Sequence, residues 1–414
     1  MAIEGEKWLS VIGIGESGLT ELTPSARGFV DRASLIVGGN RHLAMLDSPQ
    51  TQLVWTSPIE ESIESILKYR GTPVCILASG DPLCYGIGVT LLRYISIAEM
   101  TIIPAPATFS LICARLGWSL TEVETVSLCG RDPAFLTAIL APRSKLLVLS
   151  AGADTPQIVA DLLTQRGYGD SQIAVLEHLG GTRERVVTGI ARSWSRTDVA
   201  ALNAIAIECQ IDPDTTPLNR LPGLPESAYH HDGQLTKREV RAITLAALAP
   251  MPGELLWDVG AGCGSIGIEW LRSHPRCQAI AIEQHFHRLQ FIADNMAALG
   301  TPHLQLIQGK APTVLADLPT PDAIFIGGGV TAPGLLDTCW TALRSGGRLV
   351  ANAVTVESEL QLLQWHQQVG GELTRIAIQR TQNIGGFLGW KPLIPVTQLV
   401  VRKEMKVSVG SLAG

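Results

Sequence analysis

No apolar run in the sequence approaches the roughly 20 residues that a helix needs to span a bilayer. Basic residues are not in excess either. The 32 Lys and Arg against 38 Asp and Glu give a formal net charge of −6, so neither a nucleic-acid partner nor an acidic membrane surface is expected. The amino terminus lacks the basic segment and apolar core of a secretory signal. The eight cysteines are scattered singly, without Cys-x-x-Cys or zinc spacing, which predicts reduced thiols, no metal site and a cytoplasmic protein.

What the sequence does contain is the composition of a well-packed α/β protein. With 414 residues, 46% of them hydrophobic and 17% charged, the chain is long enough for two or three domains. Strand-like apolar runs alternate with helical patterns, which predicts α/β layers. Four prolines fall within 211–225, which is typical of a connector. The predicted division is a first domain at 1–210, a linker at 211–228, a second domain at 229–404 and a tail at 405–414.

The most informative pattern lies at 254–270. An apolar run at 255–257 ends at Asp258 and is followed by three alternating glycines that begin at Gly260. This pattern predicts a strand, a tight turn and a helix whose first N–H groups point over the turn. Glycine suits such a turn because a side chain would block the close approach of a ligand to the backbone.

Two classes of ligand fit this turn. The spacing Gly262-x-Gly264-x-x-Gly267 satisfies the dinucleotide fingerprint. The spacing Asp258-x-Gly260-x-Gly262-x-Gly264 is instead the pattern of S-adenosylmethionine (SAM) methyltransferases, which we favour; a purely structural turn is the third possibility. Both ligands require a carboxylate at the end of the next strand to hold ribose hydroxyls, and Glu283 closes the apolar run 279–282.

A second glycine loop follows the strand predicted at 8–15. Its spacing, Gly13-x-Gly15-x-x-Gly18, also fits a dinucleotide fingerprint. The next helix, however, is predicted to begin at a Thr23 cap with Pro24 in its first turn. Because this helix is set back from the glycines, no phosphate can bind at its N-terminus. A tight turn and a ligand-lining loop both remain open for this segment.

The strand predicted at 73–78 ends in Ser79-Gly80-Asp81-Pro82. Open α/β sheets bind ligands at the carboxyl ends of their strands, although Gly-Asp-Pro is also a common turn. Residues 101–110 predict a further strand that ends in a small-residue turn before a helix.

Four motifs of the first half occur in one order: Gly13-Ile-Gly15 followed by Leu-Thr, Gly-Gly-Asn-Arg-His42, Ala-Ser-Gly-Asp-Pro-Leu-Cys-Tyr-Gly86, and Cys-Gly-Arg-Asp132. Together they resemble the tetrapyrrole (corrin/porphyrin) methylase family, and most of all its corrin C5-methyltransferase branch. The resemblance implies a class III fold of two α/β lobes with SAM in the cleft between them. The implied cofactor-binding residues are Ser79, Gly80, Asp81, Cys84, Ala107 and Thr108, and the implied tetrapyrrole-binding residues are Gly13, Gly15 and Arg41.

Two positions depart from the pattern of that family. Cys129 stands where the family often has His before Gly-Arg, and Ala107 stands where it often has a hydroxyl. A thiol could replace a required His at neutral pH only if its pKa were depressed. No catalytic residue is therefore assigned in this half.

The second half carries Leu-Thr-Lys-Arg-Glu-Val-Arg241, the glycine loop, Phe-Ile-Gly-Gly-Gly329 and Ala-Asn-Ala-Val-Thr355. This string is similar to the corrin C15-methyltransferase/decarboxylase family, which implies a Rossmann-like class I SAM-dependent methyltransferase fold with seven strands. A helix at 236–248 is predicted to start with a capping box formed by Thr236 and Glu239. The implied cofactor-binding residues are Thr236, Gly260, Ala261, Gly262, Cys263, Gly264, Glu283 and Ala311, and the implied substrate-binding residues are Gly327, Gly328 and Asn352.

Over nearly its whole length, the chain resembles the fused C5- and C15-methyltransferases of cobalamin biosynthesis. The resemblance implies two SAM sites, methylation of precorrin-6Y at C5 by the first half and at C15 by the second, and loss of CO2 from the C12 acetate to give precorrin-8X. Related stand-alone second domains assemble, so a homo-oligomer is expected. The tetrapyrrole carries many carboxylates, for which the candidate partners are Arg41, His42, Arg131, Lys237, Arg238 and Arg241.

Three alternatives stay open. The same reactions could act on the cobalt-containing intermediate of the oxygen-independent pathway, because that metal belongs to the substrate. A SAM-binding protein without turnover would fit the departures at Ala107 and Cys129. A dinucleotide oxidoreductase would fit the glycine loop, but it gives no reason for the strands predicted after Glu283.

Overall fold

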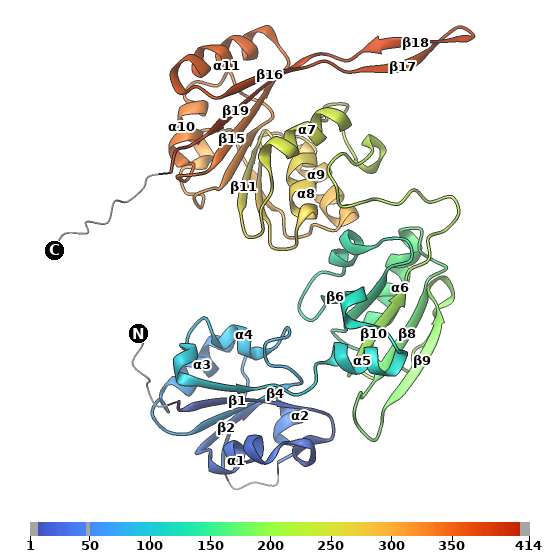
Figure 1. Ribbon diagram of the computed structural model, residues 1–414, viewed down its shortest axis with the longest axis vertical. Helices are drawn as coiled ribbons and strands as arrows, with labels where there is room; N and C mark the ends of the chain where they lie inside the picture. The colour runs from blue at the N-terminus through green and yellow to red at the C-terminus, as the bar shows by residue number, and fades with distance from the viewer. Residues whose placement is uncertain (1–6, 47–49, 406–414) are drawn as a thin grey trace, which may run out of the picture. The chain divides into compact units, whose positions relative to one another are not determined.

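The computed structural model describes residues 7–46 and 50–405, which form two compact units (Figure 1). The first unit comprises the described residues up to 133 together with 141–215. The second comprises 134–140 and the described residues from 216 onward. The main division, after Thr215, falls inside the segment 211–228. The short segment 134–140 belongs to the second unit although it lies in the first half of the sequence.

The first unit opens with a parallel five-stranded sheet in the order β3-β2-β4-β1-β5. Its central strands are almost wholly apolar and buried, as a parallel sheet covered on both faces requires. The first helix begins as predicted, because Oγ1 of Thr23 accepts from the N–H of Ala26 at 3.2 Å. The elements are β1 (Leu9–Ile14), α1 (Pro24–Arg32), β2 (Leu35–Gly38), α2 (Asn40–Leu43), β3 (Thr51–Val54), α3 (Ile59–Leu67), β4 (Val74–Ser79), α4 (Ile87–Leu91) and β5 (Met100–Ile103).

A second lobe of the same unit contains a mixed sheet in the order β6-β7-β10-β8-β9. Only β6 and β7 pair in parallel; the other neighbours are antiparallel. Phe109 and Ile112 of α5 pack on its apolar face together with Leu147 and Leu176. The elements are α5 (Thr108–Leu116), β6 (Val123–Ser127), β7 (Lys145–Leu149), α6 (Thr155–Gln165), β8 (Gln172–Glu177), β9 (Arg185–Ile190) and β10 (Asn203–Glu208).

The second unit is built on a seven-stranded sheet in the order β13-β12-β11-β14-β15-β19-β16. Six strands run in one direction, and β19 runs against them between β15 and β16, which confirms the seven-stranded fold expected from the sequence. Trp270 lies in the core on one face, and Trp257 and Trp365 lie in the core on the other. The elements are α7 (Arg238–Leu248), β11 (Leu255–Val259), α8 (Ser265–Ser273), β12 (Gln278–Glu283), α9 (Phe286–Leu299), β13 (Gln305–Gln308), β14 (Ala323–Ile326), α10 (Leu335–Ala342), β15 (Arg348–Ala353), α11 (Val356–Val369), β16 (Glu372–Ile376) and β19 (Val396–Arg402).

Short 3-10 helices complete the secondary structure of the described residues. They are η1 (Gly18–Glu21), η2 (Ile97–Glu99), η3 (Leu120–Glu122), η4 (Pro133–Ile139), η5 (Ala191–Ser193), η6 (Glu226–Ala228) and η7 (Thr313–Leu315).

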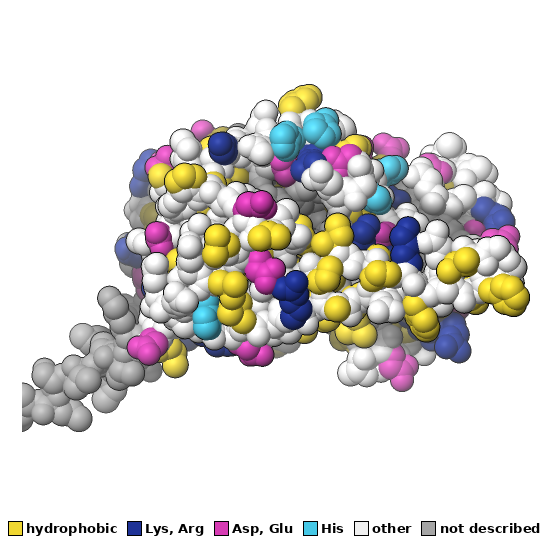
Figure 2. All heavy atoms as spheres, turned by 90° about the horizontal axis from the view of Figure 1, so that it is seen from above, with side chains coloured by type: hydrophobic (Ala, Val, Ile, Leu, Met, Phe, Trp, Pro, Cys, Tyr) yellow, Lys and Arg dark blue, Asp and Glu magenta, His cyan; other side chains and the backbone are white. Residues whose placement is uncertain are grey.

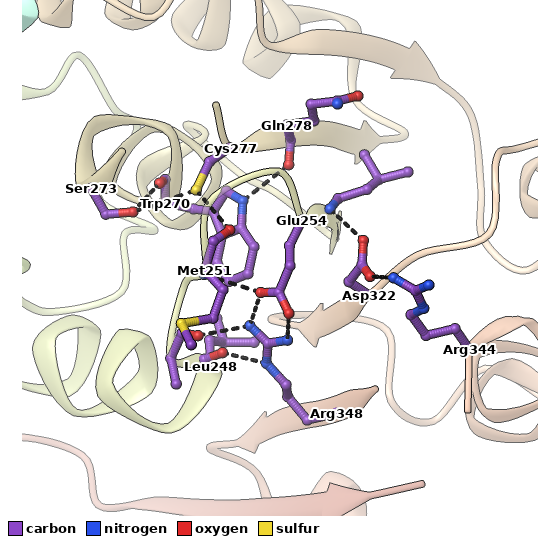
Figure 3. A network of polar contacts seen from close by, with 12 residues as sticks. Leu248, Met251, Glu254, Trp270, Ser273, Cys277, Gln278, Asp322, Arg344 and Arg348 are labelled. Carbon is purple, nitrogen blue, oxygen red and sulfur yellow. Dashed lines mark hydrogen bonds and ion pairs between the residues drawn. The ribbon is translucent and has the colours of Figure 1, made fainter. Parts of the chain in front are cut away.

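A polar network closes the amino-terminal edge of the seven-stranded sheet (Figure 3). Arg348, the first residue of β15, is buried and pairs with Glu254 at 2.5 Å. Its Nε donates to the carbonyl of Leu248 at 2.5 Å, and its guanidinium lies 5.3 Å from the centre of the Trp270 ring. The network fixes the end of α7 to the start of β11 and β15. The carboxyl ends of the strands, on the opposite edge, remain open for a ligand.

A two-stranded hairpin projects from the second unit (Figure 1). It is formed by β17 (Gln379–Ile384) and β18 (Phe387–Pro392), which pair only with each other. No motif in the sequence predicts this hairpin. Its strand residues are mostly exposed, including several large apolar side chains.

The predicted capping box at the start of α7 is wrong. The helix begins at Arg238, its N-cap is Lys237, and no side chain caps it. Glu239 instead binds NH2 of Arg380 at 2.5 Å, and the carbonyl of Thr236 accepts from NH1 of Arg241 at 2.6 Å. Thr236 and Glu239 thus bind two arginines, Arg241 of α7 itself and Arg380 of the hairpin, instead of capping the helix.

Within the part of the chain that the structure describes, no helix is both long and apolar enough to cross a membrane. In the same residues, no cluster of three or more His, Cys, Asp or Glu side chains is placed to hold a metal ion.

Candidate functional site

A cavity of about 1170 Å³ lies at the carboxyl ends of the parallel strands in the second unit. The loops after β11, β12, β14 and β15 line it, together with the segment before α7 and the base of the hairpin. Open α/β sheets bind ligands at this edge. The structure thus brings together most residues predicted for the second half: Thr236, Gly260, Ala261, Gly262, Cys263, Glu283, Ala311, Gly327, Gly328 and Asn352.

Glycines are required in this loop for two different reasons. Gly260 has φ +71°, and a Cβ there would lie 2.9 Å from the backbone nitrogen of Gly328. The loops after β11 and β14 can therefore meet only if Gly260 has no side chain. Gly264 has φ +81° and does not line the cavity; a Cβ there would lie 2.9 Å from Ile292 of α9. Gly264 thus serves the packing of the helices rather than the cavity.

Glu283 ends β12 as a buried carboxylate that lines the cavity. Its Oε2 accepts from the N–H of Gly262, and its Oε1 accepts from the N–H of His285, each at 2.9 Å. These bonds hold the glycine loop against the end of β12. An ionised carboxylate has about four acceptor positions, so each oxygen can still accept from a ribose hydroxyl.

Asp258, which opens the glycine loop, does not line the cavity. Its Oδ2 accepts from the N–H of Gly267 at 2.9 Å, which fixes the start of α8 to the end of β11. Complete burial raises the pKa of Asp258 to about 7. The hydrogen bond from Gly267 lowers this pKa, and the negative charge of Glu283 raises it further.

Asn352 lines the cavity from β15 and is held rigidly from behind. Its Nδ2 donates to Oγ1 of Thr244 at 2.9 Å, and its Oδ1 accepts from Nε2 of Gln398 at 2.9 Å. Gln398 lies directly opposite Asn352 on β19 and also donates to Thr244. The sequence analysis found Asn352 but neither buried partner, because they lie 108 and 46 residues away.

Several cations line the cavity, but not all of those expected. Lys237 and Lys310 line it, as does Arg288, which is already bound to Asp232 at 2.9 Å. Arg241, predicted as a partner of substrate carboxylates, is fully buried and paired with Glu269. That prediction for Arg241 is wrong, because the helix turns this residue toward the core.

The base of the hairpin forms an apolar wall of the cavity. Ile378 precedes β17, and Pro392, Leu393 and Ile394 lie at the end of β18 and just beyond it. These residues were not predicted from the sequence, because they belong to no recognisable motif. Their position makes the hairpin part of the site.

In the first unit, the carboxyl ends of β1, β4 and β5 meet closely. A Cβ on Gly13 would lie 2.0 Å from the carbonyl oxygen of Gly80 and 2.4 Å from the nitrogen of Ala105. A Cβ on Gly15 would lie 2.8 Å from Oε2 of Glu21. Gly13 is thus required by the contact between strands, whatever else the loop binds.

The Ser79-Gly80-Asp81-Pro82 segment is a tight turn at the end of β4. Gly80 has φ +57°, and Oδ1 of Asp81 accepts from the N–H of Leu83 at 2.8 Å. Cys84 follows as a half-buried residue, and burial raises the pKa of its thiol.

The two departures from the family pattern have plain structural settings. Ala107 is the N-cap of α5 and gives it no side-chain hydrogen bond; Thr108 is the first residue of the helix. Cys129 is exposed, and its Sγ donates to the carbonyl of Ser150 at 3.2 Å.

Arg41, predicted to bind the tetrapyrrole, belongs to a polar cluster. Its NH2 donates to Oγ of Ser79 at 2.9 Å and to Nε2 of His42 at 3.0 Å, and its NH1 donates to Oε2 of Glu16 at 2.5 Å. Glu16 in turn binds His178 of the second lobe. Sequence reasoning missed Glu16 and His178, which are 162 residues apart.

Comparison with known proteins agrees with this arrangement. A family model described as "Tetrapyrrole (Corrin/Porphyrin) Methylases" matches residues 9–193, and one described as "Precorrin methyltransferase domain" matches 227–403. The "Precorrin-6Y C(5,15)-methyltransferase [decarboxylating]" of Sinorhizobium sp is 47% identical over 393 residues, which cover 94% of this chain and 95% of that protein. The chain belongs to the family of decarboxylating precorrin-6Y C5,15-methyltransferases.

Two single-activity relatives match less of the chain. The "Cobalt-precorrin-7 C(5)-methyltransferase" of Salmonella typhimurium is 31% identical over 43% of this chain and 88% of its own length. A Pyrobaculum calidifontis protein named "Probable cobalt-precorrin-6B C(15)-methyltransferase (decarboxylating)" is 32% identical over 42% of this chain and 93% of its own length. The family's fused members therefore share sequence with separate proteins named for each activity.

Proposed function

We propose that this chain methylates precorrin-6Y at C5 and C15 with SAM and releases the carboxyl group of the C12 acetate as CO2, giving precorrin-8X in cobalamin biosynthesis. The observation that carries the proposal is the cavity of the second unit, where a glycine loop, Glu283 and Asn352 meet in a chain that belongs to this family. The first unit is assigned the C5 methylation, and the second unit the C15 methylation and decarboxylation. Each unit has its own SAM site.

The residues present fit SAM in the second unit. Gly260 lets the loop after β11 meet the loop after β14 at the cavity, and Glu283 presents carboxylate oxygens there. When bound, SAM supplies an electrophilic methyl group on sulfur. Glu283 would hold the ribose hydroxyls, and the loop from Gly260 to Cys263 would lie along the rest of the cofactor. No covalent intermediate on the protein is needed, because holding both partners in line supplies much of the rate.

The same cavity suits a flat, polycarboxylate ring. Gly327–Gly329 places no side chain above the end of β14, which leaves width for the ring. Asn352 offers an amide whose orientation is fixed by Thr244 and Gln398. Lys310 and Lys237 line the cavity and are the cations proposed to pair with ring carboxylates, although Nζ of Lys237 also lies 3.2 Å from Oε2 of Glu226.

The apolar wall of the cavity favours decarboxylation. As CO2 leaves, the carbon–carbon bond breaks and its electron pair passes into the conjugated ring; a proton from water then adds to the remaining acetate carbon and completes its methyl group. An anionic carboxylate beside Ile378, Leu393 and Ile394 loses hydration that these side chains cannot replace. Neutral CO2 suffers no such penalty, so the wall raises the energy of the reactant relative to the product.

Mass spectrometry tests the proposal directly. Incubated with precorrin-6Y and SAM, the chain should yield a product with two added methyl groups and one CO2 lost. A gain of one methyl group with loss of CO2 would mean that only the second unit is active. The departures at Ala107 and Cys129 would then have inactivated the first unit. No change would favour a binding protein without turnover. The cobalt-containing intermediate, assayed in parallel, tests the second candidate substrate.

Calorimetry tests the number of cofactor sites. Titration with SAM should show two sites per chain, and titration with NADH should show no binding. A single SAM site would contradict the two-site proposal, and tight NADH binding would favour the alternative of a dinucleotide oxidoreductase.

We also propose that the chain forms a homo-oligomer in the cytoplasm. The hairpin of the second unit exposes large apolar side chains on a pair of strands that no other strand of the described chain joins. An isolated two-stranded hairpin is marginally stable in water, so a second copy is a fitting cover for it. All eight cysteines are free, as a reducing compartment favours; cell fractionation tests the location.

A further inference from the structure

A buried carboxylate links the two lobes of the first unit. The side chain of Glu16, which follows β1, is 9% exposed, and its Oε1 lies 2.9 Å from Nδ1 of His178, directly after β8. The fit is close, because a Cβ on Gly181 would lie 2.3 Å from Cγ of Glu16. Next to it, Oγ of Ser17 donates to the carbonyl of Gly180 at 2.7 Å. The loop after β1 is thereby fixed to the turn after β8.

This contact determines which ring nitrogen of His178 carries the proton. Burial of the Glu16 carboxyl raises its pKa, but the hydrogen bonds and charges of His178 and Arg41 outweigh burial and lower the pKa below its ordinary value. Glu16 is therefore ionised and can only accept hydrogen bonds. Nδ1 of His178 must therefore be the donor, so in the tautomer that can accept a proton the lone pair lies on Nε2.

Nε2 of His178 is available for chemistry. No residue in the described ranges forms a hydrogen bond to it, and the side chain is 16% exposed. The backbone of His178 has φ +47°, a strained conformation for a residue with a side chain, and such strain gathers at functional sites. An imidazole oriented by a carboxylate, with its second nitrogen open, is the arrangement of a general base.

His42, the other histidine of this unit, cannot serve as that base. Its Nε2 accepts from NH2 of Arg41 at 3.0 Å and lies 3.0 Å from Oγ of Ser79. Burial and the charge of Arg41 lower the pKa of His42 to about 4. The ring is thus a neutral acceptor whose lone pair is already used.

We propose that His178, oriented by Glu16, is the general base that removes the proton from the bridge carbon methylated in the first unit. This rests on the proposed function, because replacing hydrogen by methyl at a bridge carbon releases one proton. The electron pair of the bridge carbon forms the new bond to the methyl carbon, and the carbon–sulfur bond breaks with its pair on sulfur. The bridge carbon then carries both hydrogen and methyl. Nε2 of His178 takes that hydrogen as a proton, and the pair of the broken carbon–hydrogen bond returns to the conjugated ring.

The proposal assigns Glu16 two tasks in that step. It holds the imidazole in the tautomer that can accept, and its negative charge stabilises the imidazolium that forms. The charged groups that face the pair are Arg41 and Arg183, both bound to Glu16, and Glu177, adjacent in sequence. The exposed edge of His178 returns the proton to water.

The test is His178→Asn in the full chain, assayed with precorrin-6Y and SAM. Asn keeps an N–H near the position of Nδ1 and removes Nε2. The second unit serves as an internal control, since its methyl transfer and CO2 release should proceed at the wild-type rate. The rate of C5 methylation should fall at least about 100-fold, as loss of a general base does, while the first unit keeps its SAM site. Arg196→Gln, which removes an exposed partner of Asp198 away from this pair, should stay within about twofold of wild type.

Three results would overturn the proposal. C5 methylation by His178→Asn at the wild-type rate would exclude the base. A loss of rate accompanied by loss of the SAM site of the first unit would assign His178 a structural role. Failure of the wild-type chain to methylate C5 would contradict the proposed function itself. This outcome differs from failure of the His178 proposal because it is seen without any substitution.

Discussion

Nε of Arg241 lies 2.6 Å from Oε1 of Glu269, and the two side chains are 0% and 2% exposed. Glu269 of α8 also accepts from the N–H groups of Gly223 and Leu224 and from the hydroxyl of Tyr229. The pair thus fastens the end of the proline-rich segment to the two helices behind the cavity. Both charged side chains are buried, and the Glu269 carboxylate accepts from four donors.

Substitution of Glu269 by Gln should destabilise the second unit strongly. The change leaves the Arg241 guanidinium buried without a countercharge, which costs about 3–5 kcal/mol of unfolding free energy. Urea unfolding followed by tryptophan fluorescence measures the loss. The control is Arg375→Gln, which breaks the exposed pair with Glu359 and should cost at most about 1 kcal/mol. Equal effects of the two substitutions would contradict this account.

The example of Arg241 shows where sequence reasoning reaches its limit. The strand, turn and carboxylate around Asp258 and Glu283 were predictable, because the chemistry lies in a local pattern with one fixed spacing. Arg241 was misassigned because its partner is 28 residues away on another helix. The same applies to Asn352, whose site was predicted but whose partners on α7 and β19 were not.

Long-range contacts also explain what was missed in the first unit and in the hairpin. Glu16 and His178 form one polar group only because two lobes place the ends of β1 and β8 together. Neither residue belongs to a recognisable motif. The hairpin lacks an apolar core face, so alternation of apolar and polar residues could not reveal it.

Gly260→Ala should abolish one of the two proposed SAM sites. A side chain at φ +71° is strained, and its Cβ would lie 2.9 Å from the nitrogen of Gly328, so the loops after β11 and β14 must separate. Titration should then show one site instead of two, with the first unit unaffected. Gly253→Ala is the matched control, since φ is +93° there and nothing lies within 4 Å of a Cβ. It should cost about 1–3 kcal/mol of stability but keep both sites. Two intact sites in Gly260→Ala would contradict the prediction.

Asp258 should make the stability of the second unit depend on pH. Burial raises its pKa to about 7 from 3.8, so between these values the folded chain holds a proton that the unfolded chain has released. The stabilisation is present below the unfolded pKa and is lost as the pH rises through about 7. Asp258→Asn removes this titration. The unfolding free energy of wild type should therefore fall relative to Asp258→Asn between about pH 4 and about pH 7 and level off above that range. A difference that stays constant over this range would show that Asp258 does not titrate there.

Ala107→Ser should stabilise the first unit. Ala107 is the N-cap of α5, with φ −65° and ψ 150°, and provides no side-chain acceptor. A Ser there can accept from an N–H of the first turn, which is worth about 1 kcal/mol. Thermal unfolding should shift upward by a few degrees, while Ala107→Val, which adds volume without an acceptor, should not stabilise. An equal gain from Val would point to filled space instead of a cap. We therefore expect that Ala107, in place of the hydroxyl residue typical of the family, makes the first unit less stable.

The hairpin gives the sharpest test of assembly. Phe387 and Trp390 are 83% and 70% exposed on β18, and Figure 2 shows hydrophobic side chains gathered over the projecting arm at the right. Burial of one such ring against a second copy contributes about 1.5–3 kcal/mol. Replacing both residues by Ser should therefore shift light scattering from an oligomer to a monomer. The matched control replaces Leu360 and Leu363, exposed apolar residues of α11, and should leave the oligomer intact. A monomeric wild type would refute the oligomer, and an oligomer that survives loss of both rings would place its interface elsewhere.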